Sequence, residues 1–243
     1  MEIRILPTKA EIAKECGDIF INAINEKPNA VLGLATGATP VPTYEYIVDS
    51  FKAGKVSFKD VVTFNLDEYV DLPKNDVNSY YSFMMANLFD HVDIDKNNVH
   101  LLDGNAADTA KECADYDKLI ESFGGIDIQL LGIGTNGHIG FNEPADEFTD
   151  GTFKVKLTDS TIKSNIIYFP DGNMPHYALT MGIGSIMKAK KIILIATGSA
   201  KVDAVKKLVE GEVDPGCPAS ILQKHEDVII FLDEDAAKGL NNK

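Results

Sequence analysis

The chain has 243 residues, and its 37 acidic and 23 basic side chains give a formal net charge of −14. We expect no nucleic-acid partner, because binding to a phosphate backbone needs a basic face. No apolar run is long enough to span a membrane and the N-terminus lacks a signal-peptide pattern, so a cytoplasmic protein without membrane contact is predicted. Three cysteines without a C-x-x-C spacing predict neither a disulfide framework nor a metal site.

Helical patterns alternate with apolar runs along the chain. The first helical pattern opens at Thr8, which has Glu11 at the capping-box position, and extends to about Asn25. Another amphipathic pattern follows Ser199. Five strands are expected, at Val31–Ala35, Val61–Leu66, Ile126–Ile133, Lys191–Thr197 and Val228–Leu232. This alternation predicts a single α/β domain over residues 1–243, with a doubly wound, mostly parallel, Rossmann-like sheet covered by helices on both faces.

The segment after the first expected strand is a candidate anion site. Thr36, Gly37, Ala38 and Thr39 offer hydroxyls and free backbone N–H groups just before a helix that starts with proline. Such a turn can bind an anion at the N-terminus of the helix. It matches neither a Walker loop nor a dinucleotide fingerprint. From this segment alone, a tight turn in which Thr39 caps the helix is an equally good interpretation.

Two other strands also end in polar residues. Asp67 and Glu68 follow the second strand, and Lys201 closes a Gly-Ser-Ala-Lys turn after the fourth. Taken singly, an acidic pair is usually a solvated turn and a lone lysine is usually a surface residue. Because the carboxyl ends of parallel strands meet at one edge of a sheet, we expect these residues to share one crevice. That crevice would suit a small phosphorylated substrate.

The glycine-rich stretch after the third strand carries an imidazole, His138, and a carboxylate five residues later, Glu143. In isolation His138 can simply pack in a turn while Glu143 faces water. Beside Asp67, however, a metal-free His–carboxylate pair suits proton abstraction next to a carbonyl, as in aldose–ketose isomerisation. Partial burial would raise the pKa of Asp67 and make it a better base. The sequence contains no G-x-S-x-G motif, so covalent catalysis by a serine nucleophile is not indicated.

Three strings in these regions resemble the glucosamine-6-phosphate deaminases: Leu34–Pro40, Phe64–Tyr69 and Gly132–Pro144. The similarity runs through nearly the whole chain and includes Asn78–Tyr81 and Tyr177–Gly182. The string Gly-His-Ile-Gly-Phe-Asn-Glu-Pro is highly specific. The related 6-phosphogluconolactonases share the fold and Gly-His-Ile but lack Phe-Asn-Glu-Pro.

The resemblance implies that glucosamine 6-phosphate is converted to fructose 6-phosphate and ammonia without a cofactor. Asp67 would take the C2 proton and return one at C1, and His138, held by Glu143, would open the pyranose ring. A lid over the site is expected near residues 157–180. The positions that match the family's phosphate-binding residues are Thr36, Gly37, Ala38, Thr39 and Lys201.

The chain departs from the family pattern at two places near the site. Many members carry aspartate where this chain has Asn136. An amide can orient His138 but cannot stabilise an imidazolium by charge, so Asn136 stays a candidate site residue and a shifted pH profile is expected. Members usually have a lid arginine after an asparagine, whereas Ser164–Tyr168 has none. Lys163 is a candidate replacement, and the galactosamine 6-phosphate epimer stays open as a substrate.

The resemblance also bears on regulation and on competing functions. Longer, hexameric members are activated by N-acetylglucosamine 6-phosphate through cations whose positions here hold Asp146, Phe153 and Val155. We therefore expect no such activation, and a monomer or small homo-oligomer. A sugar-phosphate lactonase and a sugar-sensing effector domain are two competing functions on related folds. Intact Asp67 disfavours the first, and the roughly thirty residues before the first strand predict one helix rather than a DNA-reading pair.

Overall fold

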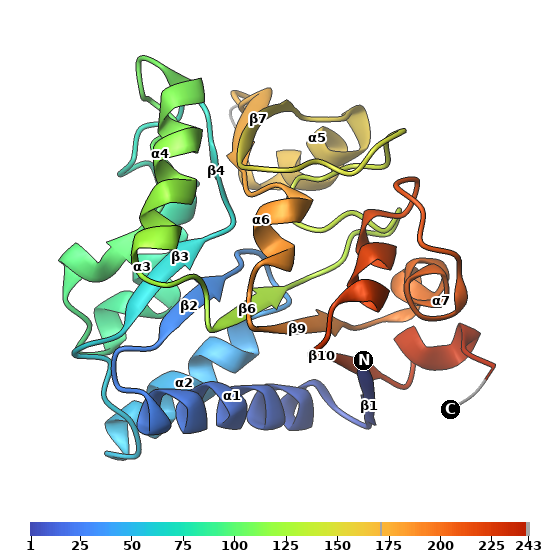
Figure 1. Cartoon of the computed structure of the whole chain (residues 1–243), viewed down its shortest axis with the longest axis horizontal. Helices are drawn as coiled ribbons and strands as arrows, with labels where there is room; N and C mark the ends of the chain where they lie inside the picture. Colours follow the sequence, from blue (N-terminus) through green and yellow to red (C-terminus); the bar gives the residue numbers. More distant parts are fainter. Residues whose placement is uncertain (171, 242–243) are drawn as a thin grey trace.

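The computed structural model describes residues 1–170 and 172–241, and a seven-stranded sheet crosses its middle (Figure 1). All pairings in this sheet are parallel, in the order β1-β10-β9-β6-β2-β3-β5. The strands are β1 (Glu2–Leu6), β2 (Val31–Leu34), β3 (Val62–Asn65), β5 (Val99–His100), β6 (Ile128–Leu131), β9 (Lys191–Ala196) and β10 (Val228–Asp233). The predicted doubly wound parallel sheet is confirmed, with β1 and β5 added at its two edges.

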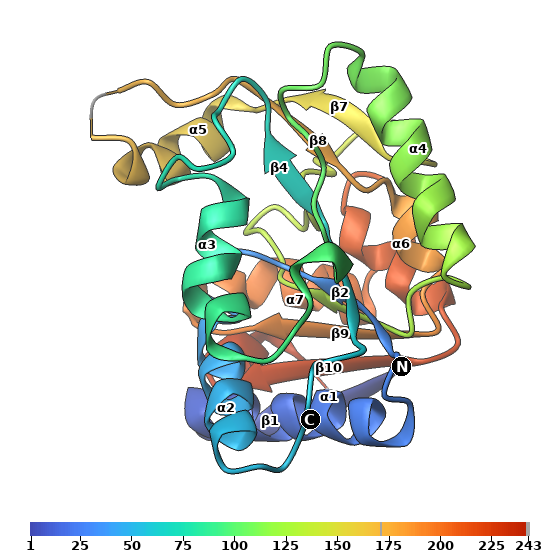
Figure 2. The ribbon, with the colours of Figure 1, turned by 90° about the vertical axis from the view of Figure 1, so that its left-hand side faces the viewer.

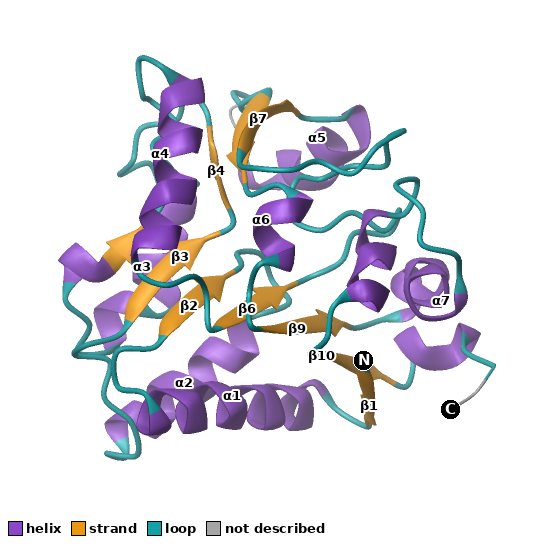
Figure 3. Ribbon diagram, viewed as in Figure 1, coloured by secondary structure: helices purple, strands orange, loops and turns teal. Residues whose placement is uncertain are grey.

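Helices cover both faces of the sheet (Figure 3). One face packs against α1, α2 and α3, and the other against α4, α6 and α7. The α-helices are α1 (Lys9–Glu26), α2 (Val41–Lys52), α3 (Tyr80–Asn87), α4 (Thr109–Ser122), α5 (Asp159–Asn165), α6 (Ile183–Met187) and α7 (Val202–Glu210). Short 3-10 helices are η1 (Phe89–His91), η2 (Lys96–Asn98), η3 (Ile166–Tyr168), η4 (Ser199–Lys201), η5 (Pro218–Lys224) and η6 (Ala236–Gly239).

Helix α1 shows how the sequence pattern becomes packing. The hydroxyl of Thr8 accepts a hydrogen bond from the N–H of Glu11 at 3.2 Å and so starts the helix at the expected capping box. Cys16, Phe20 and Ile24 then recur every fourth residue and are buried against the sheet. Full burial of a large apolar side chain such as Phe20 contributes roughly 1.5–3 kcal/mol.

A second, antiparallel sheet lies beyond the carboxyl ends of the main strands (Figure 2). It consists of β4 (Asp67–Tyr69), β8 (Tyr177–Thr180) and β7 (Phe153–Lys156), with Asp67 opposite Thr180. The acidic pair after β3 is therefore part of a buried strand and not a solvated turn. Residues 177–180, which were expected to belong to a lid, are fixed between β4 and β7. The part of the expected lid outside this sheet is 157–176, of which residue 171 lies outside the described residues.

The order of the strands creates one switch point, between β2 and β6. From β2 the chain proceeds to β3 and β5 on one side, and from β6 it proceeds to β9 and β10 on the other. At such a point the loops that leave neighbouring strands turn away from each other and open a crevice. The loops concerned are those that begin at Ala35 and at Gly132.

Residues 1–170 and 172–241 contain neither a membrane-spanning helix nor a metal-binding cluster of side chains. No helix there is long and apolar enough to cross a lipid bilayer. No group of three or more histidine, cysteine, aspartate or glutamate side chains is arranged to hold a metal ion. Cys16, Cys113 and Cys217 are all buried and free.

Candidate active site

A cavity of about 330 Å³ opens at the carboxyl ends of β2, β3, β6 and β9. Its wall combines the loop after β2, the start of β4, the glycine-rich loop after β6, and residues of α3 and α5. Six of the residues that the sequence proposed line it together: Thr36, Gly37, Thr39, Asp67, His138 and Lys201. The convergence expected from parallel strand ends is therefore present.

Asp67 is the carboxylate in this wall. It is a buried residue, only 7% exposed, at the point where β3 passes into β4. Burial, and then the charge of Glu68, raise the pKa of Asp67 to about 8. Gly140 lies opposite with φ of +56°, and a Cβ there would stand 3.6 Å from Oδ2 of Asp67. Glycine suits this turn, because residues with a Cβ rarely adopt a positive φ.

Glu68 has a different role from its neighbour. Its carboxylate accepts hydrogen bonds from the backbone N–H groups of Tyr69 (2.8 Å), Tyr80 (3.0 Å) and Tyr81 (2.9 Å). Burial raises the pKa of Glu68 although these hydrogen bonds oppose the change. The residue fastens β4 to the N-terminus of α3 and so brings Tyr80 to the cavity wall.

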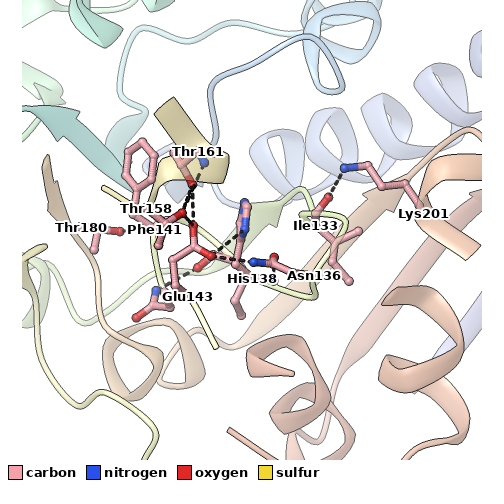
Figure 4. A network of polar contacts seen from close by, with 11 residues as sticks. Ile133, Asn136, His138, Phe141, Glu143, Thr158, Thr161, Thr180 and Lys201 are labelled. Carbon is pink, nitrogen blue, oxygen red and sulfur yellow. Dashed lines mark hydrogen bonds and ion pairs between the residues drawn. The ribbon is translucent and has the colours of Figure 1, made fainter. Parts of the chain in front are cut away.

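His138 is held within the glycine-rich loop (Figure 4). Its Nδ1 lies 3.5 Å from Oε2 of Glu143, and its backbone N–H donates to Oδ1 of Asn136 at 3.2 Å. The amide of Asn136 also donates to Oε2 of Glu143 at 2.7 Å. A Cβ at Gly134 would lie 2.2 Å from the imidazole ring, so the ring rests on bare backbone. Asn136 and Glu143 lie behind His138 and not in the cavity wall.

The second oxygen of Glu143 is bound from a separate part of the chain. Oε1 accepts hydrogen bonds from the hydroxyls of Thr161 at 2.5 Å and Thr158 at 3.3 Å, both at the start of α5. Burial would raise the pKa of Glu143, but its interactions with His138 and Thr161 outweigh it and lower the pKa to about 2. Glu143 is therefore ionised at neutral pH. Sequence reasoning did not identify either threonine, since nothing in a Thr-x-x-Thr spacing reveals a partner so distant in the chain.

The loop after β2 presents unpaired backbone donors. Gly37 has φ of +91°, which turns the loop, and no described residue accepts a hydrogen bond from the N–H groups of residues 36–39. Pro40 is the N-cap of α2 and no side chain caps this helix, so the interpretation of Thr39 as a cap is wrong. The hydroxyl of Tyr44 donates to the carbonyl of Ala35 at 2.6 Å and anchors the loop. These features fit an anion site.

Lys201 supplies a cation to the wall of the cavity. Its Nζ donates to the carbonyl of Ile133 at 2.7 Å, which joins the β9 turn to the end of β6 (Figure 4). Burial lowers the pKa of the Lys201 ammonium. The turn itself is held by Asp233, whose two oxygens each accept from the N–H of Gly198 at 2.9 Å.

Two proposed residues lie elsewhere. Ala38 belongs to the loop of residues 36–39, here called the anion loop, but lines two neighbouring cavities and not this one. Lys163 is exposed on α5, whereas Thr161 and Asn165 of the same helix face the cavity. Lys163 therefore does not stand in for the lid arginine in this structure.

A buried carboxylate, an imidazole–carboxylate pair and a loop with unpaired backbone donors meet at the switch point of a doubly wound sheet, where α/β enzymes bind their ligands. The fold and the site are those of an α/β enzyme that acts on a small molecule. The model of the family of glucosamine-6-phosphate isomerases and 6-phosphogluconolactonases matches residues 7–231, and the chain belongs to this family.

Similar proteins include two curated relatives named glucosamine-6-phosphate deaminase. The protein of Clostridium novyi is 49% identical over 95% of this chain and 96% of its own length. That of Lysinibacillus sphaericus is 52% identical over 92% of this chain and 95% of its own length. A solved monomeric glucosamine-6-phosphate deaminase superposes with a TM-score of 0.96 at 42% identity, over 99% of this chain and 100% of that one. The 6-phosphogluconolactonase of Trypanosoma brucei, 21% identical with a TM-score of 0.79 over 98% of both chains, shares the fold.

Proposed function

We propose that this enzyme is a glucosamine-6-phosphate deaminase, which isomerises glucosamine 6-phosphate and releases ammonia to give fructose 6-phosphate. The observation that carries the proposal is the shared cavity, in which Asp67 and His138 face an anion loop and Lys201. The relatives named above act on this substrate by their names, and their similarity extends over nearly the whole chain.

Ring opening comes first. The substrate binds as a pyranose, and His138 takes the proton of the C1 hydroxyl and returns it to the ring oxygen as the C1–O5 bond breaks. Glu143 remains a carboxylate throughout, because its pKa of about 2 keeps it ionised. Its contact with Nδ1 orients the imidazole and offsets the charge of the imidazolium.

Proton transfer at carbon follows. The carboxylate of Asp67 removes the C2 proton from the open chain, the electron pair of that bond forms the C1–C2 double bond, and the C1 oxygen takes a proton from solvent, to which the nitrogen returns one when the imine forms. Asp67 then returns its proton to C1, which leaves an imine at C2. Water adds to the imine and ammonia departs to give the ketose. A base with a pKa raised to about 8 suits this step, since base strength rises with pKa.

The phosphate would be held at the switch point. The free N–H groups of residues 36–39 and the N-terminus of α2 supply donors, and Lys201 supplies charge. Residues 157–176 would act as the lid, with Thr161 and Asn165 over the sugar. We propose a monomer, as in the solved relative.

The test is ammonia release, with EDTA present, from glucosamine 6-phosphate and galactosamine 6-phosphate assayed side by side. Strong release from the first supports the proposal. Preference for the second would assign the activity to the C4 epimer, a candidate because Ile166 and Ile167 replace the arginine region of the lid. Release from neither, with hydrolysis of 6-phosphogluconolactone, would replace the proposal with a lactonase.

A further inference from the structure

The two oxygens of Glu143 are bound by two different parts of the chain. Oε2 faces Nδ1 of His138 at 3.5 Å and accepts from Asn136, both in the glycine-rich loop. Oε1 accepts from Thr158, the N-cap of α5, and from Thr161 in the first turn of that helix. The Glu143 carboxylate thus connects the glycine-rich loop to α5 (Figure 4).

We propose that Thr161 is a positioning residue whose hydroxyl holds the Glu143 carboxylate against His138 and makes ring opening depend on the seated position of α5. This inference rests on the proposed function and adds a coupling between the lid and the imidazole.

Thr161 is the stronger of the two hydroxyl donors. Its oxygen is 2.5 Å from Oε1 of Glu143, against 3.3 Å for Thr158. The hydroxyl of Thr158 also points to Oγ1 of Thr161 at 3.0 Å, and its oxygen accepts from the N–H of Thr161 at 3.3 Å. A hydroxyl has one proton to donate, so Thr158 divides its proton between two acceptors. Thr161 is also buried and lines the cavity.

The geometry at His138 makes the carboxylate position critical. Nδ1 is buried and has no hydrogen-bond partner among the described residues, and its contact with Glu143 is already at 3.5 Å. A small rotation of the carboxylate would lose the contact altogether. The imidazole would then lose both its orientation and the charge that stabilises its protonated form. A donor on Oε1 prevents that rotation.

The experiment compares Thr161→Val with Thr161→Ser, alone and with Glu143→Gln. Thr161→Val keeps the branched shape and removes the hydroxyl that donates to the charged Glu143 carboxylate, so kcat/KM for glucosamine 6-phosphate should fall about tenfold. Thr161→Ser restores the hydroxyl and most of the activity. Affinity for 2-amino-2-deoxyglucitol 6-phosphate, which has no ring to open, stays within about twofold of the parent's, because Lys201 and the loop of residues 36–39, which are proposed to hold the phosphate, are untouched. Lys163→Ala, on the exposed side of α5, serves as the matched control and leaves both quantities unchanged.

The double variant decides how Thr161 acts. If it works through Glu143, Thr161→Val causes no further loss once Glu143→Gln is present. The inference would be overturned if the losses of kcat/KM in the two single variants multiplied in the double variant, or if Thr161→Ser did not restore activity. It would also be overturned if Thr161→Val lost as much affinity for the open-chain alcohol as it lost in kcat/KM. If the parent enzyme releases ammonia and Thr161→Val releases it equally fast, this inference is overturned but the proposed function stands. A parent that releases none removes the proposed function and this inference with it.

Discussion

Asp67 is the residue on which the proposed chemistry depends. Asp67→Asn keeps the shape of the side chain and removes the base, so ammonia release should fall at least about a hundredfold. Affinity for the open-chain alcohol phosphate should change little, because the anion loop and Lys201 are untouched. Turnover is measured by ammonia release and affinity by calorimetric titration. Near-normal turnover in this variant would exclude Asp67 as the base.

The raised pKa of Asp67 also fixes the sign of the pH dependence. The base must be ionised, and its pKa in the free enzyme is raised to about 8 by burial and by Glu68. Below that pH, kcat/KM should fall about tenfold for each pH unit, as expected for one required ionisation. A profile of kcat/KM between about pH 5 and 9 checks this, with substrate titration taken into account. A flat profile across roughly pH 6 to 8 would contradict the assignment.

The same pKa makes Asp67 a source of instability at higher pH. Its pKa is about 8 in the folded protein and 3.8 in the unfolded reference, so only the folded state holds the proton between these values. The stability that this bound proton adds to the folded state is fully present below pH 3.8. It declines by up to about 1.4 kcal/mol per pH unit above pH 3.8 and is lost above pH 8. Asp67→Asn should therefore raise Tm at about pH 8 and change it little at about pH 4. Thermal unfolding at both pH values tests this, and equal gains at the two would refute it.

Much of the site was accessible from sequence because its residues stand at strand ends. Asp67, His138 and Lys201 each follow a long apolar run, and the parallel topology then makes them meet. Thr161 and Tyr80 were not identified. Their place in the cavity depends on how α5 and α3 sit against the second sheet, and no local pattern encodes that contact.

At the scale of elements, the junction between β4 and α3 supports the base. Glu68→Gln replaces one acceptor oxygen by an amide that faces a backbone donor such as the N–H of Tyr81, so the free energy of unfolding should drop by about 2 kcal/mol. Removal of the Glu68 charge should also lower the pKa of Asp67 and move the acid limb of the rate profile to lower pH.

Urea unfolding and the kcat/KM profile measure the two effects of Glu68→Gln. Glu147→Gln removes an exposed carboxylate instead and is the matched control. A stable Glu68→Gln variant with an unshifted acid limb would show that the residue neither fastens β4 nor acts on Asp67.

The elements that sequence reasoning missed share a physical cause. Strands such as β9 and β10 are buried on both faces and read as continuous apolar runs. In contrast, β4 has three residues of which two are acidic, and β7 alternates half-buried Phe153 and Val155 with exposed lysines. Their strand structure comes from pairing with β8, over 100 residues from β4, and short charged segments carry no such signal.

For the whole molecule, the decisive property is the order of the strands. Because β2 and β6 are neighbours while their onward connections diverge, the anion loop and the glycine-rich loop open onto one crevice. The net charge of −14 does not attract an anionic substrate from a distance, so the phosphate must be held by local donors. Substrate affinity should therefore be governed by Lys201 and the N–H groups of residues 36–39.

The same charge distribution argues against activation by N-acetylglucosamine 6-phosphate. An activator phosphate needs cations. The positions that match the cations of the longer, activated family members hold Asp146, which is exposed and negative, and Phe153 and Val155 of β7. The strand's period of two directs its lysines, Lys154 and Lys156, to the opposite, exposed side. Substrate saturation curves with and without saturating N-acetylglucosamine 6-phosphate should therefore superpose and be hyperbolic. A steeper or faster curve in its presence would mean that these lysines, or other cations, form an effector site after all.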